Sequence, residues 1–259
     1  MAGMLAILVG VVLLGGAGLL YAAYRRESRV LRAAAIGAVA AVDADHRRDP
    51  ARTLERLTHW VYDNQGFAKN SRYFLSPRCG PTPLQVLESG GDCADKSRLL
   101  AAMLDELGIP STLVMLYAPD YARPTHTVVE TRLPGFRAAA DPVFDIVFPD
   151  GTGGLLGVAQ LQQQPERFEA RIHALAAERG PASKVAFYPT ELESYRWPRT
   201  INWERRPATR VLGSVLGWFV PEPDLVTRPR LLAEPKLLVS IALCWPGLVC
   251  VGLGWLLMR

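Results

Sequence analysis

The chain has 259 residues, a net charge of +4 and a sequence pI near 9.0. Its arginines are spread along the sequence rather than gathered beside aromatic residues, so we predict no nucleic-acid partner. The mean hydropathy of +0.11 is high for a soluble protein, and it reflects two apolar segments at the ends of the chain.

These two apolar segments are predicted to cross a membrane. Met1–Tyr24 and Leu237–Met258 carry no charged side chain. As a helix, each is long enough to cross a hydrocarbon core of about 30 Å. Because no positively charged residue precedes the first segment, we predict an uncleaved anchor rather than a signal peptide. We therefore expect transmembrane helices at residues 1–24 and 236–258.

The charges that flank the two helices indicate the side of the membrane on which the central residues lie. Basic residues follow the first segment and precede the second, at Arg25, Arg26, Arg29, Arg32, Arg228, Arg230 and Lys236. By the positive-inside rule, the central domain lies on the cytoplasmic face, in contact with membrane lipid. An extracytoplasmic domain is the alternative, because long domains cross membranes regardless of flanking charge.

Helices and a loop are predicted after the first segment. Residues 25–49 are expected to form a juxtamembrane helix and linker. Residues 51–64 have apolar side chains at helical spacing on one face. Proline and glycine then make a loop of residues 76–83.

The segment SGGDCADKSRLLAAMLDELGIP, residues 89–110, predicts a helix that starts at a cysteine. Its apolar residues recur at the three-to-four spacing of one buried helix face. Asp92 is suited to cap the first turn, and Gly108 with Pro110 ends the helix. Cys93 therefore falls beside free backbone N–H groups at the positive end of the helix dipole. A thiol most readily becomes a thiolate at such a position.

Short strands are predicted after the cysteine helix. Residues 111–117 form a nearly continuous apolar run, which is typical of a buried strand. Residues 125–132 and 137–141 are expected to pair as a hairpin. Residues 156–235 are interpreted as a C-terminal extension with amphipathic helices. One of them, residues 208–220, either lies on the bilayer or closes the domain core.

The predicted hairpin brings a histidine and a carboxylate close to each other. Pairing centred on residue 134 puts His126 opposite residue 142, give or take one, so His126 and Asp141 fall on adjacent rungs within reach of an imidazole–carboxylate hydrogen bond. A slip of one residue would move a side chain to the other face. A nucleophilic cysteine needs such a base and a group that orients the base. We therefore predict a triad of Cys93, His126 and Asp141, with Asp145 as the alternative carboxylate.

Three segments in this order resemble the transglutaminase-like superfamily, a relative of the papain-like fold: GGDCADKSRLLAAMLDELGIP, THTVVE and AADPVFD. The preceding TPLQVLESGGDC adds to the resemblance, which covers roughly residues 50–150. It implies an α+β fold in which a cysteine helix packs on an antiparallel sheet, here between two transmembrane helices. We accordingly place a transglutaminase-like domain at residues 50–155 and expect a membrane-anchored member of bacterial type, in an inner membrane.

The resemblance also implies a role for each matching residue. Cys93 would be the nucleophile, His126 the general base and acid, and Asp141 the group that orients the histidine. The backbone N–H of Cys93 would donate to the oxyanion, and Gln85 is the nearest candidate for a side-chain donor. The implied substrate is a protein or peptide amide, attacked through a thioester without a cofactor.

The sequence leaves several functions open. Release of the thioester by water makes a hydrolase, and release by an amine makes an acyltransferase; we favour water, which needs no second binding site. A non-catalytic module that binds other membrane proteins is the alternative. Zinc held by Cys93, His126 and Asp141 is a further reading. No CxxC spacing is present, so we predict no structural metal. A disulfide between Cys79 and Cys93 stays possible in an extracytoplasmic domain and would silence the thiol.

Overall fold

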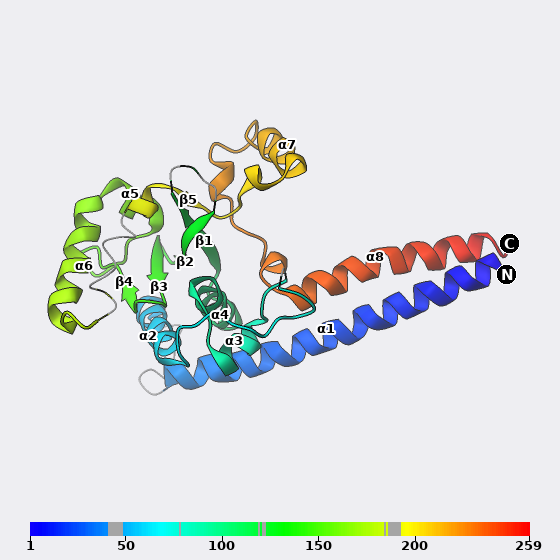
Figure 1. Ribbon diagram of the computed structural model, residues 1–259, viewed down its shortest axis with the longest axis horizontal. Coiled ribbons are helices and arrows are strands. Elements are labelled where there is room, and N and C mark those ends of the chain that lie inside the picture. Colours follow the sequence, from blue (N-terminus) through cyan, green and yellow to red (C-terminus); the bar gives the residue numbers. More distant parts are fainter. Residues whose placement is uncertain (41–48, 78, 119, 121–122, 184, 186–192) are drawn as a thin grey trace.

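The computed structural model describes the whole chain except residues 41–48, 78, 119, 121–122, 184 and 186–192 (Figure 1). A domain of helices around one antiparallel sheet carries a long hairpin of two helices, and both termini lie at the tip of this hairpin. The elements in chain order are α1 (Ala2–Ala40), α2 (Pro50–Asp63), α3 (Pro83–Ser89), α4 (Cys93–Glu106), β1 (Ser111–Tyr117), β2 (Pro124–Leu133), β3 (Phe136–Asp141), β4 (Ile146–Val147), α5 (Val158–Gln163), α6 (Pro165–Arg179), η2 (Glu193–Arg196), β5 (Pro198–Arg199), η3 (Trp203–Arg205), α7 (Pro207–Leu216), η4 (Pro223–Leu225), η5 (Arg230–Leu232) and α8 (Pro235–Leu256).

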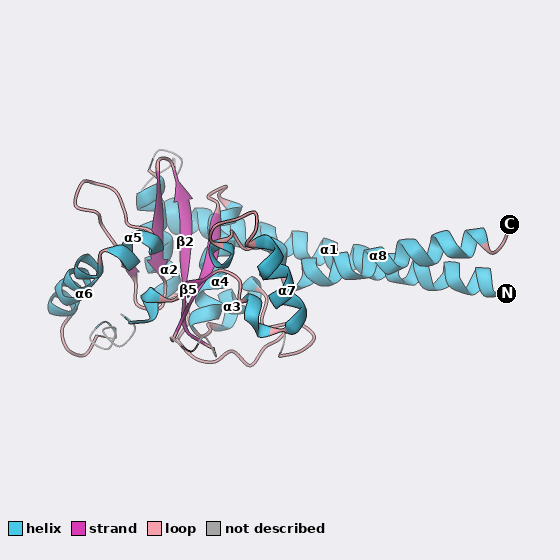
Figure 2. Cartoon of the chain, turned by 90° about the horizontal axis from the view of Figure 1, so that it is seen from above, coloured by secondary structure: helices cyan, strands magenta, loops and turns pink. Residues whose placement is uncertain are grey.

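The hairpin consists of α1 and α8, which lie side by side (Figures 1 and 2). Glycines let the two backbones approach closely. A Cβ on Gly10 would lie 2.7 Å from the carbonyl oxygen of Gly247, and one on Gly254 would lie 2.6 Å from that of Gly3. Both helices are long and apolar enough to cross a membrane, and 17% of the apolar window of each is buried. The core helix of a soluble protein would be mostly buried instead.

Helix α1 continues past the predicted membrane boundary near residue 24 without interruption. Its second half packs into the domain core, where Leu31 and Ala35 are buried. Between the two halves, the carboxylate of the buried Glu27 accepts a hydrogen bond of 2.6 Å from Lys236 Nζ, at the beginning of α8. One continuous helix therefore forms both an apolar arm of the hairpin and a wall of the domain.

The five-stranded sheet has the order β4-β3-β2-β1-β5 and separates two layers of apolar side chains. Leu113, Val129 and Ala140 pack with residues of α1, α2 and α4 on one face. Val114 and Val128 pack with residues of α5 and α6 on the other face. The alternation follows from the two-residue period of a strand, and it explains why these strands are apolar on both sides.

The segment interpreted as a C-terminal extension packs on this same sheet. Helices α5 and α6 cover one face, and β5 pairs with β1 at the edge. The sequence-based limits at residues 50 and 155 therefore lie inside one packed unit. Helix α7 differs from α5 and α6: Gly213 is buried, whereas Val211 and Leu212 are exposed. Its apolar face does not close the domain core.

A buried lysine joins the cysteine helix α4 to the end of α2. Lys96 Nζ donates hydrogen bonds to the carbonyl oxygens of Val61, Tyr62 and Asn64, at 2.6, 2.9 and 3.2 Å. It also lies 3.5 Å from the carbonyl oxygen of Gln65. Carbonyl groups in the last turn of a helix have no partner within the helix. A positive charge beside them is also favourable because of the helix dipole.

Replacement of this lysine tests how much the contact stabilises the domain. Lys96→Met keeps an unbranched side chain but leaves the carbonyl groups without their donor. We expect the free energy of unfolding to fall by about 3 kcal/mol. Chemical denaturation of the full chain in detergent measures the change. Lys69→Met, at an exposed lysine, is the matched control and should change little. Equal stability of the two variants would refute the role of Lys96.

Candidate active site

Two glycines allow the sharp entry of the chain into α4. Gly90 has a φ of +74°, which favours glycine, and a Cβ on it would lie 2.5 Å from a backbone oxygen. A Cβ on Gly91 would lie 2.3 Å from the Cβ of Asp95. The Asp92 carboxylate then accepts two backbone N–H bonds of the first turn, at 3.0 and 3.1 Å. Cys93 is the first residue of α4, as the sequence predicts.

The thiol and the backbone N–H of Cys93 are both available for chemistry. Cys93 and Cys79 are free cysteines, so no disulfide blocks the thiol. Cys93 is partly exposed. Its backbone N–H donates to no acceptor in the part of the chain that the structure describes. An N–H group at the start of a helix in this state is suited to receive an oxyanion.

One turn after Cys93, a serine attaches α4 to β2. The buried Oγ of Ser97 donates a hydrogen bond of 2.8 Å to the carbonyl oxygen of Thr127. Thr127 directly follows His126 in the strand. This bond therefore holds the first turn of α4 beside the strand position from which the histidine extends.

The turn of the β2–β3 hairpin consists of Pro134 and Gly135, between the paired residues Leu133 and Phe136. Gly135 has a φ of +86°, which is easily reached without a Cβ. The pairing is therefore centred between the two turn residues. The sequence-based pairing, centred on residue 134 give or take one residue, includes this register, which lies one residue from its central value.

The observed register brings His126 and Asp141 to the same side of the hairpin. Val129 pairs with Ala140, which puts Asp141 opposite Val128, two residues from His126. Residues two apart on a strand point to the same face. The central value of the predicted register, with His126 opposite residue 142, would have sent the two side chains to opposite faces. In the structure, His126 Nε2 lies 2.6 Å from Asp141 Oδ2.

This pair is buried, and the contacts around it affect the pKa of the histidine. Asp141 is 0% exposed and His126 is 4% exposed, and the second oxygen of Asp141 accepts the Val143 N–H at 2.9 Å. Burial by itself lowers the pKa of His126. The Asp141 carboxylate and hydrogen bonds to Asp141 and to the Cys93 thiol outweigh it and raise the pKa above its usual 6.5. The ring is thus favoured as an imidazolium beside Cys93, and the three predicted residues lie together.

The loop after β3 contributes a residue that the sequence analysis missed. Phe144 meets the His126 ring edge-on, with ring centroids 5.6 Å apart. Asp145, the alternative carboxylate, instead lies 3.0 Å from His59 Nδ1 and 3.1 Å from Arg179 Nη2. Arg179 also donates to the carbonyl oxygens of Phe144 and Asp145. Asp145 therefore anchors this loop. The contact of Phe144 links this loop to β2 and leaves no local pattern in the sequence.

Gln85 forms part of the start of α3. Its Oε1 accepts a hydrogen bond of 2.9 Å from the backbone N–H of Thr82, and Thr82 Oγ1 accepts one of 3.3 Å from the Gln85 N–H. This reciprocal pair is a capping box. The helix start accounts for the presence of a glutamine here. Donation from its amide group to an oxyanion stays a prediction.

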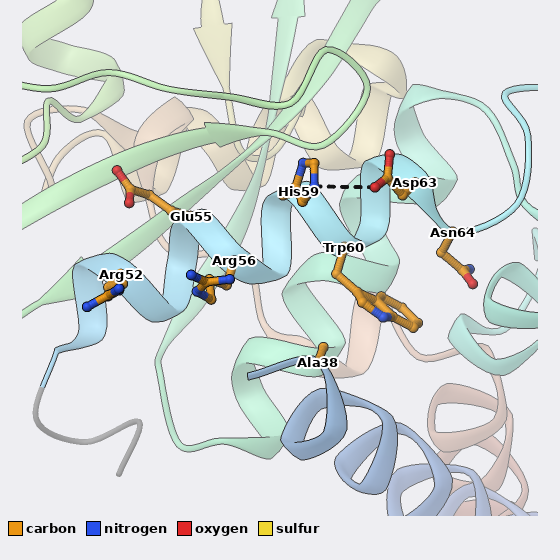
Figure 3. A pocket seen from close by; sticks show the side chains of 8 residues that line it. All are labelled: Ala38, Arg52, Glu55, Arg56, His59, Trp60, Asp63 and Asn64. Carbon is orange, nitrogen blue, oxygen red and sulfur yellow. Dashed lines mark ion pairs between the residues drawn. The ribbon is translucent and has the colours of Figure 1, made fainter. Parts of the chain in front are cut away.

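A pocket beside α2 (Figure 3) is lined by other residues than the candidate site. It has a volume of about 630 Å³ and is lined by Ala38, Arg52, Glu55, Arg56, His59, Trp60, Asp63 and Asn64. Figure 3 shows His59 facing Asp63, with 3.3 Å between Nε2 and Oδ2. The lining contains none of the triad residues, so this pocket is not the candidate active site.

Comparison with known families agrees with the resemblance. Residues 40–138 match the transglutaminase-like superfamily. The matched stretch contains Cys93 and His126 and ends before Asp141. This match places residues 40–138, which are less than half of the chain, in the transglutaminase-like superfamily. The chain has the predicted α+β fold, in which the cysteine helix packs against an antiparallel sheet between two apolar terminal helices.

Among solved structures, a candidate cysteine protease from Cytophaga hutchinsonii is similar to this chain, with 20% sequence identity and a TM-score of 0.36. The match covers 50% of this chain and 41% of that one, so it spans less than half of the relative. No curated protein matches the chain.

The raised pKa of His126 predicts that stability decreases at alkaline pH. The folded state favours the protonated ring, so this contribution is complete below the unfolded pKa of about 6.5. It is lost as the pH rises through the higher folded value. We expect the free energy of unfolding to fall between about pH 7 and about pH 10 in the wild type, and to fall less in His126→Gln.

Denaturation at several pH values measures this difference. His59→Gln, at a histidine whose side chain is 62% exposed, is the matched control and should keep the wild-type slope. The same slope in His126→Gln and in the wild type would contradict the assignment of a charged, paired ring to His126.

Proposed function

We propose that this chain is a membrane-anchored cysteine hydrolase of the transglutaminase-like type, which cleaves an amide bond in a protein or peptide. One observation carries the proposal: the buried His126–Asp141 pair, with 2.6 Å between Nε2 and Oδ2, lies beside the free thiol of Cys93 at the start of α4. A domain that only binds a partner has no physical need for these three groups together.

In the first half of the reaction, Cys93 Sγ attacks the carbonyl carbon of the substrate as a thiolate, its proton being held by His126. Because Nε2 faces Asp141, Nδ1 is the nitrogen that exchanges this proton. The Cys93 N–H donates to the oxyanion that forms. His126 then gives its proton to the leaving amine, the C–N bond breaks, and a thioester remains.

In the second half, the neutral His126 takes a proton from water, and the resulting hydroxide attacks the thioester carbonyl. The C–S bond breaks, the carboxylic acid is released, and the thiolate–imidazolium pair is restored. Asp141 keeps the ring oriented and stabilises its charged form throughout. An amine in place of water would form a new amide. We favour water, because hydrolysis needs no second substrate site.

The reactivity of Cys93 tests the proposed pair without knowledge of the substrate. In the full chain with Cys79→Ser, we expect iodoacetamide to alkylate Cys93 well below about pH 8.5, where ordinary thiols titrate. His126→Ala should slow alkylation at about pH 6 on the order of a hundredfold, because the thiolate loses its counterion. Mass spectrometry of the Cys93 peptide measures the rate.

His59→Ala is the matched control, since its ring contacts Asp63 and Asp145 instead. We expect it to alkylate at the wild-type rate. If Cys93 is alkylated at the same rate in His126→Ala as in the wild type, the enzyme proposal fails and the non-catalytic module becomes the favoured function. If His126 matters, a labelled peptide amide should be trapped as a thioester in the wild type and not in Cys93→Ser.

We further propose that α1 and α8 anchor the domain in a bacterial inner membrane, with the domain on the cytoplasmic face. The length and exposed apolar surface of the two helices support anchoring. Arg25, Arg29 and Arg32 follow the apolar part of α1 and support the cytoplasmic side. Both termini then lie on the opposite face of the membrane.

Fusions to the C-terminus test this orientation. Alkaline phosphatase, which folds in the periplasm, should be active after Arg259, and a cytoplasmic fluorescent reporter at the same site should be dark. The same two reporters inserted after Gly151, in a loop of the domain, should show the reverse pattern. Activity of the phosphatase in the loop would place the domain outside the cytoplasm.

A further inference from the structure

Helix α7 exposes a continuous apolar face. Val211, Leu212 and Val215 recur at helical spacing and are exposed, and the turn after the helix adds Trp218 and Phe219, which are 80% and 77% exposed. A soluble domain usually turns such a face toward its core. Five large apolar side chains in one exposed patch mark a surface that has a partner.

The contacts on the opposite side of α7 fix this face outward. Gly213 packs against Trp203, so closely that a Cβ on the glycine would lie 2.6 Å from the tryptophan Cβ. The Trp203 ring is itself held by a hydrogen bond of 2.9 Å from Nε1 to the carbonyl oxygen of Pro223. Thr209 Oγ1 donates to the Trp203 carbonyl oxygen at 2.7 Å. The patch is therefore exposed because the other side of α7 is attached to the domain.

The position of α7 points to the occupant. In both overall views, α7 lies at the end of the domain from which the α1–α8 hairpin projects (Figures 1 and 2). Its position along the long axis of the molecule is about that of the beginning of α8. Another exposed apolar side chain, Leu75, lies in a loop that contacts the beginning of α8. Leu75 is 73% exposed, and the neighbouring Phe74 ring lies 5.8 Å from Lys236 Nζ.

Charged residues accompany the apolar face. Arg206 and Arg210 lie one turn apart in and before α7, and both are exposed. An apolar helix face flanked by arginines is typical of helices that lie in the plane of a membrane surface. Tryptophan and phenylalanine are also suited to the boundary between headgroups and acyl chains.

We propose that α7 lies in the interface of the bilayer that α1 and α8 span, with Trp218 and Phe219 among the upper acyl chains and the arginines at the headgroups. This inference rests on the proposed membrane anchoring and is independent of the cysteine chemistry. It gives the domain a third attachment to the membrane, at a lateral distance from the hairpin.

Lipid-resident quenchers test the position of α7 in the full chain. Serine replaces the four cysteines, and single cysteines are introduced as Phe219→Cys on the patch, Leu248→Cys in α8 and Ala174→Cys on α6. Leu248 and Ala174 are both exposed in the structure, and α6 lies at the end of the domain away from the hairpin (Figure 1). Each site carries a polarity-sensitive dye in vesicles that contain nitroxide on the acyl chains.

We expect the dyes at positions 219 and 248 to be quenched by the nitroxide lipids, position 219 most strongly by nitroxide near the headgroups, and the dye at 174 to keep its intensity. Quenching at 248 with none at 219 would overturn the inference and leave the anchoring intact. A dye at 219 that is shielded from water yet not quenched would assign the patch to a second copy of the chain. Without quenching at 248, the proposed anchoring fails and the inference fails with it.

Discussion

The buried ammonium of Lys96 is the contact on which the position of the candidate nucleophile depends. Burial of a charge is costly unless hydrogen bonds replace its water, and here the carbonyl oxygens at the end of α2 replace it. Lys96 follows Cys93 by three residues, so it holds the first turn of α4 from one side. Ser97 holds the same turn against β2 from the other side. The start of α4 is thus fixed between a helix end and a strand.

The start of α4 lies where the sequence predicts it, whereas the sequence left the hairpin register open by one residue. Asp92, two glycines and an apolar face are local signals, and they determine where a helix begins. The register depends instead on the number of residues in the turn, and a change of one residue reverses the face of every side chain. The two-residue turn at Pro134 and Gly135 is what allows His126 and Asp141 to meet.

Sequence patterns did not predict the contacts between distant parts of the chain. Lys96 is 2% exposed because the end of α2 surrounds it, and the sequence around it carries no local signal of this burial. Asp145, the alternative carboxylate for the candidate triad, instead contacts His59 and Arg179, which are distant from it in the sequence. The exposed face of α7 has the same spacing as a core face, so periodicity alone could not distinguish a bilayer contact from core packing.

The continuity of α1 has a consequence for the proposed enzyme. Glu27 accepts hydrogen bonds from Lys236 at the start of α8 and from Thr82, which caps α3. Helix α3 leads directly to the glycines before Cys93. Within the described residues, Glu27 therefore connects both helices of the hairpin to the segment that leads into α4. If the hairpin spans a membrane, the thiol lies at a fixed height above the bilayer, and only an amide presented at that height can reach it. Such a constraint selects substrates by the height of their amide above the bilayer. The chemistry of a cysteine, a histidine and an aspartate does not by itself make this selection.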